Sequence, residues 1–380
     1  MAPLFSGKKK CSIFTNLFFL LSFFFSVAYG NNNNDININN NVKKPTLFIF
    51  GDSTVDVGTN NFLKTTAKAN ILYNGIDFPY SIPTGRFSNG YNTADQIARQ
   101  FGYMESPPPF LVLTKRPYSF KRKILGGANF ASAGSGILRE TGRKQWGEVK
   151  FLEKQVQQFK YAREKISEKL GEEKACRFVS NSLFLISVGS NDLFDFARNY
   201  TSIHNPQQYL AALQLTYFQH IKSLYGLGAR KFGILSIAPI GCCPALTSQN
   251  KGDCVKPLND LAIAFYSATN SLLQNLSSQL LGFKYSLGNT FLMTKTLLDT
   301  PLNFGLKETK SACCGIGYLN GQGPCNKTAG ANVCYDRNNN LFWDWFHPTE
   351  KASELAAKTL VHGNSTQFVS PINFSQLAKA

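Results

Sequence analysis

The sequence predicts an α/β protein with a mostly parallel sheet that helices cover on both faces. Two observations support this class. Short apolar runs of strand length alternate along the chain with much longer helical patterns. In the segment Val149–Leu170, apolar residues recur at three- and four-residue spacing with Lys and Glu between them, as in an amphipathic helix. In such sheets the functional groups gather at the carboxyl ends of the strands.

The predicted elements follow one another from strand to helix. The predicted strands are Thr46–Phe50, Ile124–Ala131, Leu183–Val188, Lys231–Ile237 and Phe283–Leu287. The other predicted helices are Gln207–Tyr225, Lys256–Leu281 and Pro348–Val361. Pro348 is expected at the first position of the last helix and Gly363 just past its end. The polar tail after His362 is expected to wrap the surface.

The first 44 residues differ in composition from the rest. Three lysines precede an apolar run, Ile13–Ala28, which is typical of a secretory signal peptide over residues 1–30. The alternative is a membrane anchor, but the run is shorter than the roughly 20 apolar residues of a spanning helix. Residues 31–44 form an asparagine-rich leader that we expect to be disordered. No later linker or repeat appears, so residues 45–380 are expected to form a single domain with a C-terminal tail.

Composition excludes several classes of protein. Hydrophobic residues make up 43% and charged residues 17%, which argues against a disordered chain and a coiled coil. The net charge of +17 is spread along the chain and not collected in one arm, so no nucleic-acid partner is expected. No Gly-x-x-x-x-Gly-Lys or Gly-x-Gly-x-x-Gly frame stands in the right context for a nucleotide.

The cysteines and glycosylation motifs agree with secretion. Loss of Cys11 with the signal peptide leaves an even set, which suggests disulfides: Cys176, Cys242, Cys243, Cys254, Cys313, Cys314, Cys325 and Cys334. We expect loop-closing pairs such as Cys242 with Cys254, although the sequence leaves the pairing open. Without a Cys-x-x-Cys pair and with only four histidines, no metal is expected. The candidate glycosylation sites are Asn199, Asn275, Asn326, Asn364 and Asn373.

Three residues have the types needed for nucleophilic catalysis. Ser53 follows the first predicted strand directly, where its side chain can point into the ligand crevice of an open sheet; alternatively it only caps a helix. Pro348 disfavours a helical conformation at His347, which leaves that imidazole on a loop. Asp344, three residues earlier, can orient the ring while the other ring nitrogen takes the serine proton. The alternative is a histidine that caps the last helix.

Two further strand ends offer donors for an oxyanion. The first runs from Gly127 to Gly136 and includes Gly134; the second contains Gly189-Ser190-Asn191-Asp192. Glycine lets a backbone NH approach closely, and the Asn191 amide can donate from its side chain. Each segment alone also fits an ordinary turn.

These blocks, in this order, resemble plant GDSL-type esterases/lipases of the SGNH hydrolase superfamily. The resemblance extends to residues 73–79 and 83–90 and covers almost the whole mature chain. It implies a flavodoxin-like, three-layer α/β/α fold and no cofactor. It also implies that Ser53 is the nucleophile, His347 the base and Asp344 its partner. The oxyanion hole would comprise the NH groups of Ser53 and Gly134 and the Asn191 side chain, with Gly136 as an alternative to Gly134.

The chain departs from that family pattern at two places. Thr54 replaces the leucine of the family's name, and we expect the chemistry to survive because the serine is intact. The segment Tyr80-Ser81-Ile82 replaces a typically glycine-rich stretch, which is expected to change the rim of the substrate cleft. The absence of Gly-x-Ser-x-Gly argues against the α/β-hydrolase fold.

The sequence therefore predicts a secreted serine esterase/lipase of the extracellular space or cell wall. It would hydrolyse carboxylic esters of small molecules, lipids or polyesters through an acyl-enzyme on Ser53, with no membrane span after signal cleavage. One alternative is an acyltransferase that uses the same residues and passes the acyl group to a hydroxyl. Another is a non-catalytic cell-wall protein whose basic surface holds acidic polysaccharide.

Overall fold

The computed structural model describes residues 44–198 and 205–380, and every structural statement below concerns these residues. The predicted signal peptide, residues 31–43 of the predicted leader, and Asn199 lie outside them. The chain divides after Lys44 into two units, and the fold is that of the second, Pro45–Ala380.

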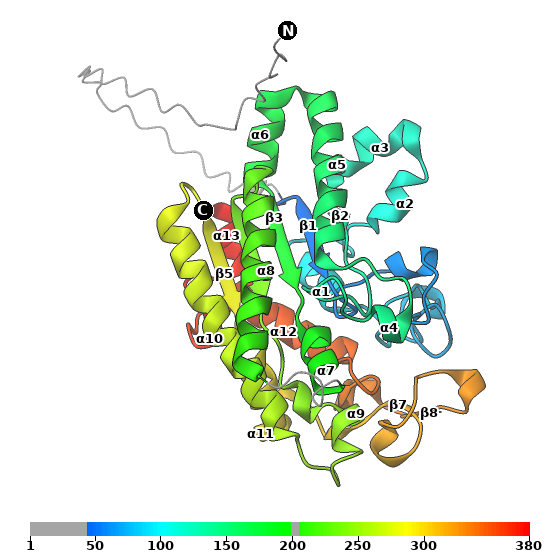
Figure 1. Cartoon of the computed structure of the whole chain (residues 1–380). Helices are drawn as coiled ribbons and strands as arrows, with labels where there is room; N and C mark the ends of the chain where they lie inside the picture. Colours follow the sequence, from blue (N-terminus) through cyan, green and yellow to red (C-terminus); the bar gives the residue numbers. More distant parts are fainter. Residues whose placement is uncertain (1–43, 199–204) are drawn as a thin grey trace, which may run out of the picture. The chain divides into compact units, whose positions relative to one another are not determined.

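A six-stranded sheet forms the centre of this unit, in the spatial order β10-β5-β4-β3-β1-β2 (Figure 1). Strands β1 to β5 pair in parallel, and β10 runs antiparallel to β5. The order 2-1-3-4-5 of the parallel strands is that of flavodoxin-like folds. The strands are β1 (Leu47–Gly51), β2 (Ala128–Asn129), β3 (Leu183–Ser187), β4 (Lys231–Leu235), β5 (Lys284–Gly288) and β10 (Val369–Ser370).

Helices cover both faces of the sheet, as the predicted three-layer α/β/α class requires. The helices are α1 (Thr93–Gln100), α2 (Phe110–Thr114), α3 (Pro117–Lys123), α4 (Arg143–Trp146), α5 (Leu152–Leu170), α6 (Glu172–Asn181), α7 (Ser190–Arg198), α8 (Pro206–Gly226), α9 (Pro244–Thr247), α10 (Lys256–Gln279), α11 (Thr290–Asp299), α12 (Glu350–His362) and α13 (Phe374–Lys379). Residues of α5, α6, α8 and α10 pack on one face, and residues of α1, α12 and α13 on the other. The predicted fold class is confirmed.

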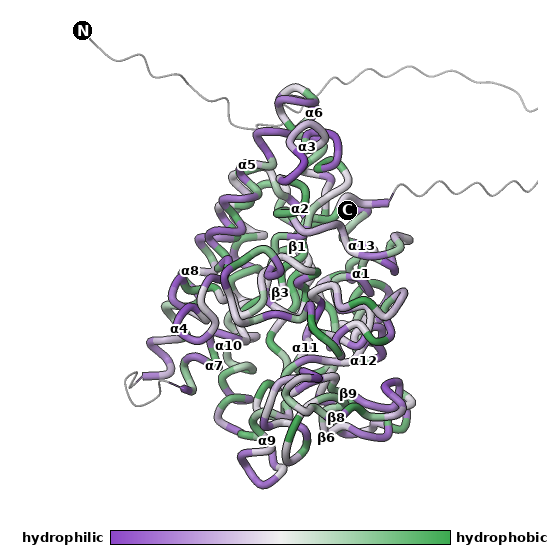
Figure 2. Tube along the Cα trace, turned by 90° about the vertical axis from the view of Figure 1, so that its right-hand side faces the viewer, coloured by the Kyte–Doolittle hydropathy of each residue, from purple (hydrophilic) through white to green (hydrophobic). Residues whose placement is uncertain are grey.

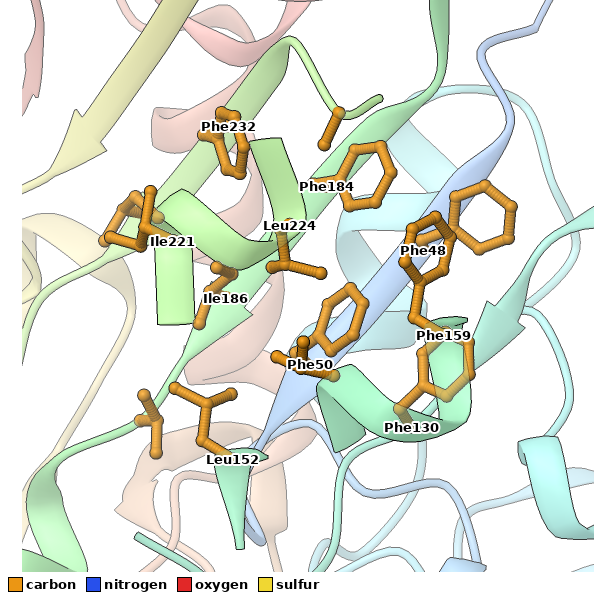
Figure 3. Close-up of a cluster of buried hydrophobic side chains, with 14 of the residues drawn as sticks. Phe48, Phe50, Phe130, Leu152, Phe159, Phe184, Ile186, Ile221, Leu224 and Phe232 are labelled. Carbon is orange, nitrogen blue, oxygen red and sulfur yellow. The ribbon is translucent and has the colours of Figure 1, made fainter. Parts of the chain in front are cut away.

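Alternating strand residues build these two cores because successive side chains of a strand point to opposite faces. Phe48 and Phe50 pack with Phe184 and Phe159 in an aromatic cluster on the α5 face (Figure 3). Leu47 and Ile49 pack on the opposite face. Both sets are buried, which explains why β1 is an unbroken apolar run and not an alternating one. Figure 2 shows the corresponding hydrophilic outer side of α5.

A small region of short strands lies beyond the sheet: β6 (Glu308–Ala312), β7 (Cys314–Gly315), β8 (Asn332–Val333) and β9 (Asn340–Phe342). Disulfides join Cys313 to Cys334 and Cys314 to Cys325, and a third joins Cys242 to Cys254 as expected. Cys243 is a buried free thiol, so the expected pairing does not extend to every mature cysteine.

The structure corrects three predicted elements. Ile124–Gly126 is a turn of 3-10 helix, and only Ala128–Asn129 pairs as a strand. Helix α12 begins at Glu350, not at Pro348, because the Thr349 side chain caps it by accepting from the NH of Ala352. Its predicted end at Gly363 is correct.

The third correction concerns the C-terminal tail, which is part of the core and does not merely wrap the surface. It adds β10 to the sheet, and Phe374 and Leu377 of α13 are fully buried. The Lys231 ammonium donates to the carbonyl of Ala378 at 2.8 Å. The polar composition of the tail gave no indication that these few apolar residues are buried.

Replacing Phe374 with alanine should therefore destabilise the whole unit. Truncation of a fully buried phenylalanine typically costs about 3–5 kcal/mol because it removes buried contacts and leaves a cavity. Chemical denaturation measures the change in the free energy of unfolding, and Lys379→Ala, at an exposed position of the same helix, is the control. Equal stability of the two variants would contradict a core role for the tail.

Candidate active site

Ser53 stands on a tight turn at the carboxyl end of β1. Gly51 makes the turn possible because its φ is +146° and a Cβ there would lie 2.1 Å from the carbonyl oxygen of Ser187 on β3. The NH of Asp52 donates to that same oxygen at 3.0 Å. The turn lies between β1 and β3, where strand order reverses, and this is the position at which open α/β sheets bind ligands.

The residues on either side of Ser53 are held together by a buried carboxylate. Asp52 accepts from the NH of Thr54 at 3.0 Å and from its hydroxyl at 2.7 Å. Burial raises the pKa of Asp52, while these bonds and His347 act in the opposite direction. The threonine that replaces the expected leucine thus adds a hydrogen bond within the turn.

Ser53, His347 and Asp344 form a continuous chain of hydrogen bonds. The hydroxyl of Ser53 lies 2.7 Å from Nε2 of His347. Nδ1 of the same ring lies 2.8 Å and 2.9 Å from the two carboxylate oxygens of Asp344. The ring of Phe87 packs against the imidazole with 4.9 Å between centroids. The sequence predicted these three residues as a set, and the structure brings them together.

The loop from Asp344 to His347 has a defined shape because Asp344 also accepts from the backbone. Its Oδ1 accepts from the NH groups of Phe346 at 2.9 Å and His347 at 2.8 Å. The NH of Trp343 donates to the carbonyl of His347 at 2.8 Å and closes the loop. His347 is therefore on a loop, as predicted, and it does not cap α12.

The disulfide-bonded region binds the strand that precedes this loop. Cys313 and Cys314 donate their NH groups to the carbonyls of Phe342 and Trp343 at 2.9 Å and 2.7 Å. The fully buried Trp343 indole donates to the Asn74 side chain at 3.0 Å. The two adjacent disulfides thus hold the strand that leads into the Asp344 and His347 loop.

The predicted oxyanion donors reach the same place from two other strand ends. Gly134 and Asn191 both line the cavity that contains Ser53 and His347, whereas Gly136 does not. Gly134 has φ +77°, and a Cβ there would lie 2.6 Å from the Trp146 ring. The Asn191 amide donates one hydrogen to the Ser135 carbonyl at 3.0 Å, and its second hydrogen is available to a ligand.

Two buried carboxylates, which sequence reasoning missed, hold the segment between these donors. Asp56 accepts from the NH of Ala133 at 2.9 Å. Asp192 accepts from the NH groups of Ile137 and Leu138 and, at 2.6 Å, from the hydroxyl of Thr141. Burial raises the pKa of each carboxyl to about 6. Both lie inside the motif blocks, within three residues of Ser53 or Asn191. This proximity in sequence could have identified them as residues that support the site.

The cavity around Ser53 has a volume of about 250 Å³ and is lined mainly by apolar side chains. Cys243 lies in its wall, and burial raises the pKa of this thiol to about 12, so the thiol is neutral. None of Tyr80, Ser81 and Ile82 lines the cavity. Tyr80 and Ser81 have φ of 63° and 52°, which explains why glycine suits this stretch.

The remaining candidate sites are glycosylation motifs. Asn275 and Asn364 are exposed and Asn326 is half-buried. Asn373 is buried and caps α13, and its side chain donates to the carbonyl of Gly363, which argues against a glycan there.

Among the described residues, no group of three or more His, Cys, Asp or Glu side chains is placed to hold a metal ion.

Comparison with known proteins agrees with this fold and motif order. Residues 47–360 match the model of the GDSL-like lipase/acylhydrolase family. GDSL esterase/lipase At4g28780 of Arabidopsis thaliana is 38% identical over 87% of this chain and 90% of its own length. GDSL esterase/lipase LTL1 of the same plant is 36% identical over 94% and 95%. The chain therefore belongs to the GDSL-like lipase/acylhydrolase family, an enzyme family of carboxylic ester hydrolases, as the motifs predicted.

The carboxyl of Asp192 should make stability depend on pH. Its pKa is raised on folding, so between about pH 4 and 6 the native state holds a proton that the unfolded chain has released. The free energy of unfolding should therefore fall as pH rises through this window. In Asp192→Asn, which cannot titrate, the fall should be smaller, with Asp56 and Glu350, whose pKa values are also raised, contributing to the remainder.

Denaturant titrations at pH 4, 5, 6 and 7 measure this slope. Thr141→Val provides the opposite control because it removes a donor that favours the ionised carboxylate. That variant should show a steeper fall than the wild type. A slope that neither substitution changes would contradict the assignment to Asp192.

Proposed function

We propose that this protein is a secreted serine esterase/lipase that hydrolyses carboxylic acyl esters through an acyl-enzyme on Ser53. In this proposal residues 1–30 are removed as a signal peptide, residues 31–44 form a leader, and residues 45–380 are the hydrolase domain. The observation that carries it is the 2.7 Å contact between the Ser53 hydroxyl and His347, whose other ring nitrogen meets Asp344.

The proposed reaction has two halves. Ser53 Oγ attacks the ester carbonyl carbon as His347 Nε2 takes its proton, and Asp344 stabilises the imidazolium. The NH groups of Ser53 and Gly134 and the amide of Asn191 would bind the oxyanion. The intermediate then expels the alcohol, which receives the proton from His347. Water, activated by the same imidazole, releases the acid and regenerates Ser53.

The disulfides support the secreted location, since such bonds persist in oxidising compartments. No helix within residues 44–198 and 205–380 is both long and apolar enough to cross a membrane. We propose the extracellular space or cell wall as the site of action. Exposed Asn275 and Asn364 are the favoured glycosylation sites.

An acyltransferase remains the second candidate because the same acyl-enzyme can react with a hydroxyl in place of water. The partly enclosed apolar cavity around Ser53 favours this option to the extent that it excludes water. Product analysis with an added sugar or phenolic alcohol separates the two reactions: a transferred acyl group identifies a transferase, and free acid alone identifies a hydrolase.

A contact with acidic cell-wall polysaccharide has one specific observation in its favour. The segment from Lys115 to Lys123, which includes α3, carries five exposed cations and no acidic residue: Lys115, Arg116, Lys121, Arg122 and Lys123. Lys121 pairs with Glu168 of α5. Such a local excess of positive charge attracts a polyanion such as pectin.

Ser53→Ala should lower kcat/KM on p-nitrophenyl esters by at least about 10³-fold because no other group replaces the nucleophile. Asn191→Ala should lower kcat about 10²- to 10³-fold through loss of an oxyanion donor. Both proteins should keep a cooperative thermal transition. Ser278→Ala, at an exposed position on α10, is the control. Wild-type turnover by folded Ser53→Ala would overturn the proposal.

Arg116→Glu, Arg122→Glu and Lys123→Glu, combined, should abolish retention on polygalacturonate without changing ester hydrolysis more than about twofold, since α3 lies outside the cavity. Wild-type protein should be retained at low salt and elute when the salt concentration is raised, whereas the triple variant should not be retained. Lys256→Glu, Lys307→Glu and Lys310→Glu give the same charge change elsewhere on the surface. Equal loss of retention in both triple variants would refute a site on α3.

A further inference from the structure

The cavity that begins at Ser53 continues along the carboxyl edge of the sheet. Its wall passes Ser187 at the end of β3 and Leu235 at the end of β4, and then reaches Thr290 after β5 and Phe368 before β10. These elements are successive neighbours in the sheet. The cavity is therefore elongated and extends from the serine across the strand ends.

Two helices line this extension with one face each. The lining residues of α11 include Met293, Thr294 and Leu297, and those of α12 include Ala352, Ala356 and Thr359. Residues three, four and seven apart lie on one side of a helix, so each helix presents one stripe of side chains to the cavity. The stripe from Ala352 to Thr359 is about 10 Å long at the usual rise per residue.

Most hydroxyls in the wall of the extension are already bonded within the protein. The hydroxyls of Thr296 and Thr359 donate to backbone carbonyls within their own helices. Those of Ser236 and Thr290 bond to each other. Apart from His347, the acidic and basic side chains among the described lining residues are those of Asp52, which adjoins the serine, and Arg198, which pairs with Asp195. A polar acyl group would lose hydrogen bonds with water there without replacing them.

We propose that this extension is a channel for the unbranched aliphatic acyl chain of the substrate, with Ala356 at its middle as a residue that determines chain length. The inference rests on the proposed function, because the ester carbonyl must lie at Ser53 for the chain to enter. It assigns medium-chain acyl esters as the preferred substrates, in place of acetyl or polar aromatic esters.

The expected chain length follows from two measures of the channel. The distance from β1 to β5 is three strand spacings, or about 14 Å, and the helix stripe is about 10 Å long. Each carbon–carbon bond of an extended chain advances about 1.25 Å. The channel therefore fits about 8 to 12 carbons.

The first experiment measures kcat/KM of the mature protein on p-nitrophenyl esters from acetate to palmitate. Each added methylene should raise kcat/KM by up to about fourfold until the channel is full, at about 8 to 12 carbons. Ala356→Phe should shift the optimum to esters at least four carbons shorter. Lys358→Phe, which adds the same ring at an exposed position of α12, should keep the wild-type profile.

A binding measurement separates failure of the channel from failure of catalysis. Calorimetric titration of Ser53→Ala with dodecanoate should show saturable binding, and the added Ala356→Phe should weaken it at least tenfold. If Ala356→Phe does not fold, Ala356→Leu replaces it and should shift the optimum by about two carbons. Hydrolysis with no dependence on chain length, or binding that Ala356 substitutions leave unchanged, would overturn the channel while leaving the esterase in place. An absence of all ester hydrolysis with intact dodecanoate binding would overturn the esterase alone.

Discussion

The parallel pairing of β1 with β3 is the constraint on which the site depends. It places the turn after Gly51 against Ser187 so closely that a side chain at Gly51 would meet the Ser187 carbonyl. The Gln155 side chain of α5 completes the contact by bonding to both the NH and the carbonyl of Gly51 at 2.8 Å. Because these groups are buried, each needs a partner, and these bonds fix the backbone just before Ser53.

Buried carboxylates carry this geometry to the donor segment. Asp56 follows the Ser53 turn and Asp192 follows Asn191, and between them they accept NH groups from both ends of residues 133–138. Burial disfavours their charged forms, as the raised pKa values of both show. The backbone NH groups that each carboxylate accepts favour its ionised form and offset part of that cost. The same hydrogen bonds hold the donor segment in place. We therefore expect these two groups to lower the free energy of unfolding near neutral pH relative to acid pH.

The loop of Asp344 and His347 completes the site after the Ser53 turn and the donor segment. It belongs to a different part of the chain and is held by other interactions. Its own hydrogen bonds to Asp344 shape it locally, while the Cys313–Cys334 and Cys314–Cys325 disulfides fix the strand before it. Thr349 then caps α12, whose inner face continues into the apolar extension of the cavity. One helix thus links the imidazole to the wall that would receive an acyl chain.

The sequence alone determined the sheet class, four of the five parallel strands to within a few residues, and the set Ser53, Asn191, Asp344 and His347. These features follow from local patterns: apolar run length, helical spacing, and polar residues directly after a strand. Tertiary structure decided that Gly134 lines the cavity while Gly136 packs against Asp192, that Cys243 stays unpaired, and that the polar tail buries Phe374. Each of these depends on contacts between segments far apart in the chain, and close packing between such segments leaves no periodic signal in either one.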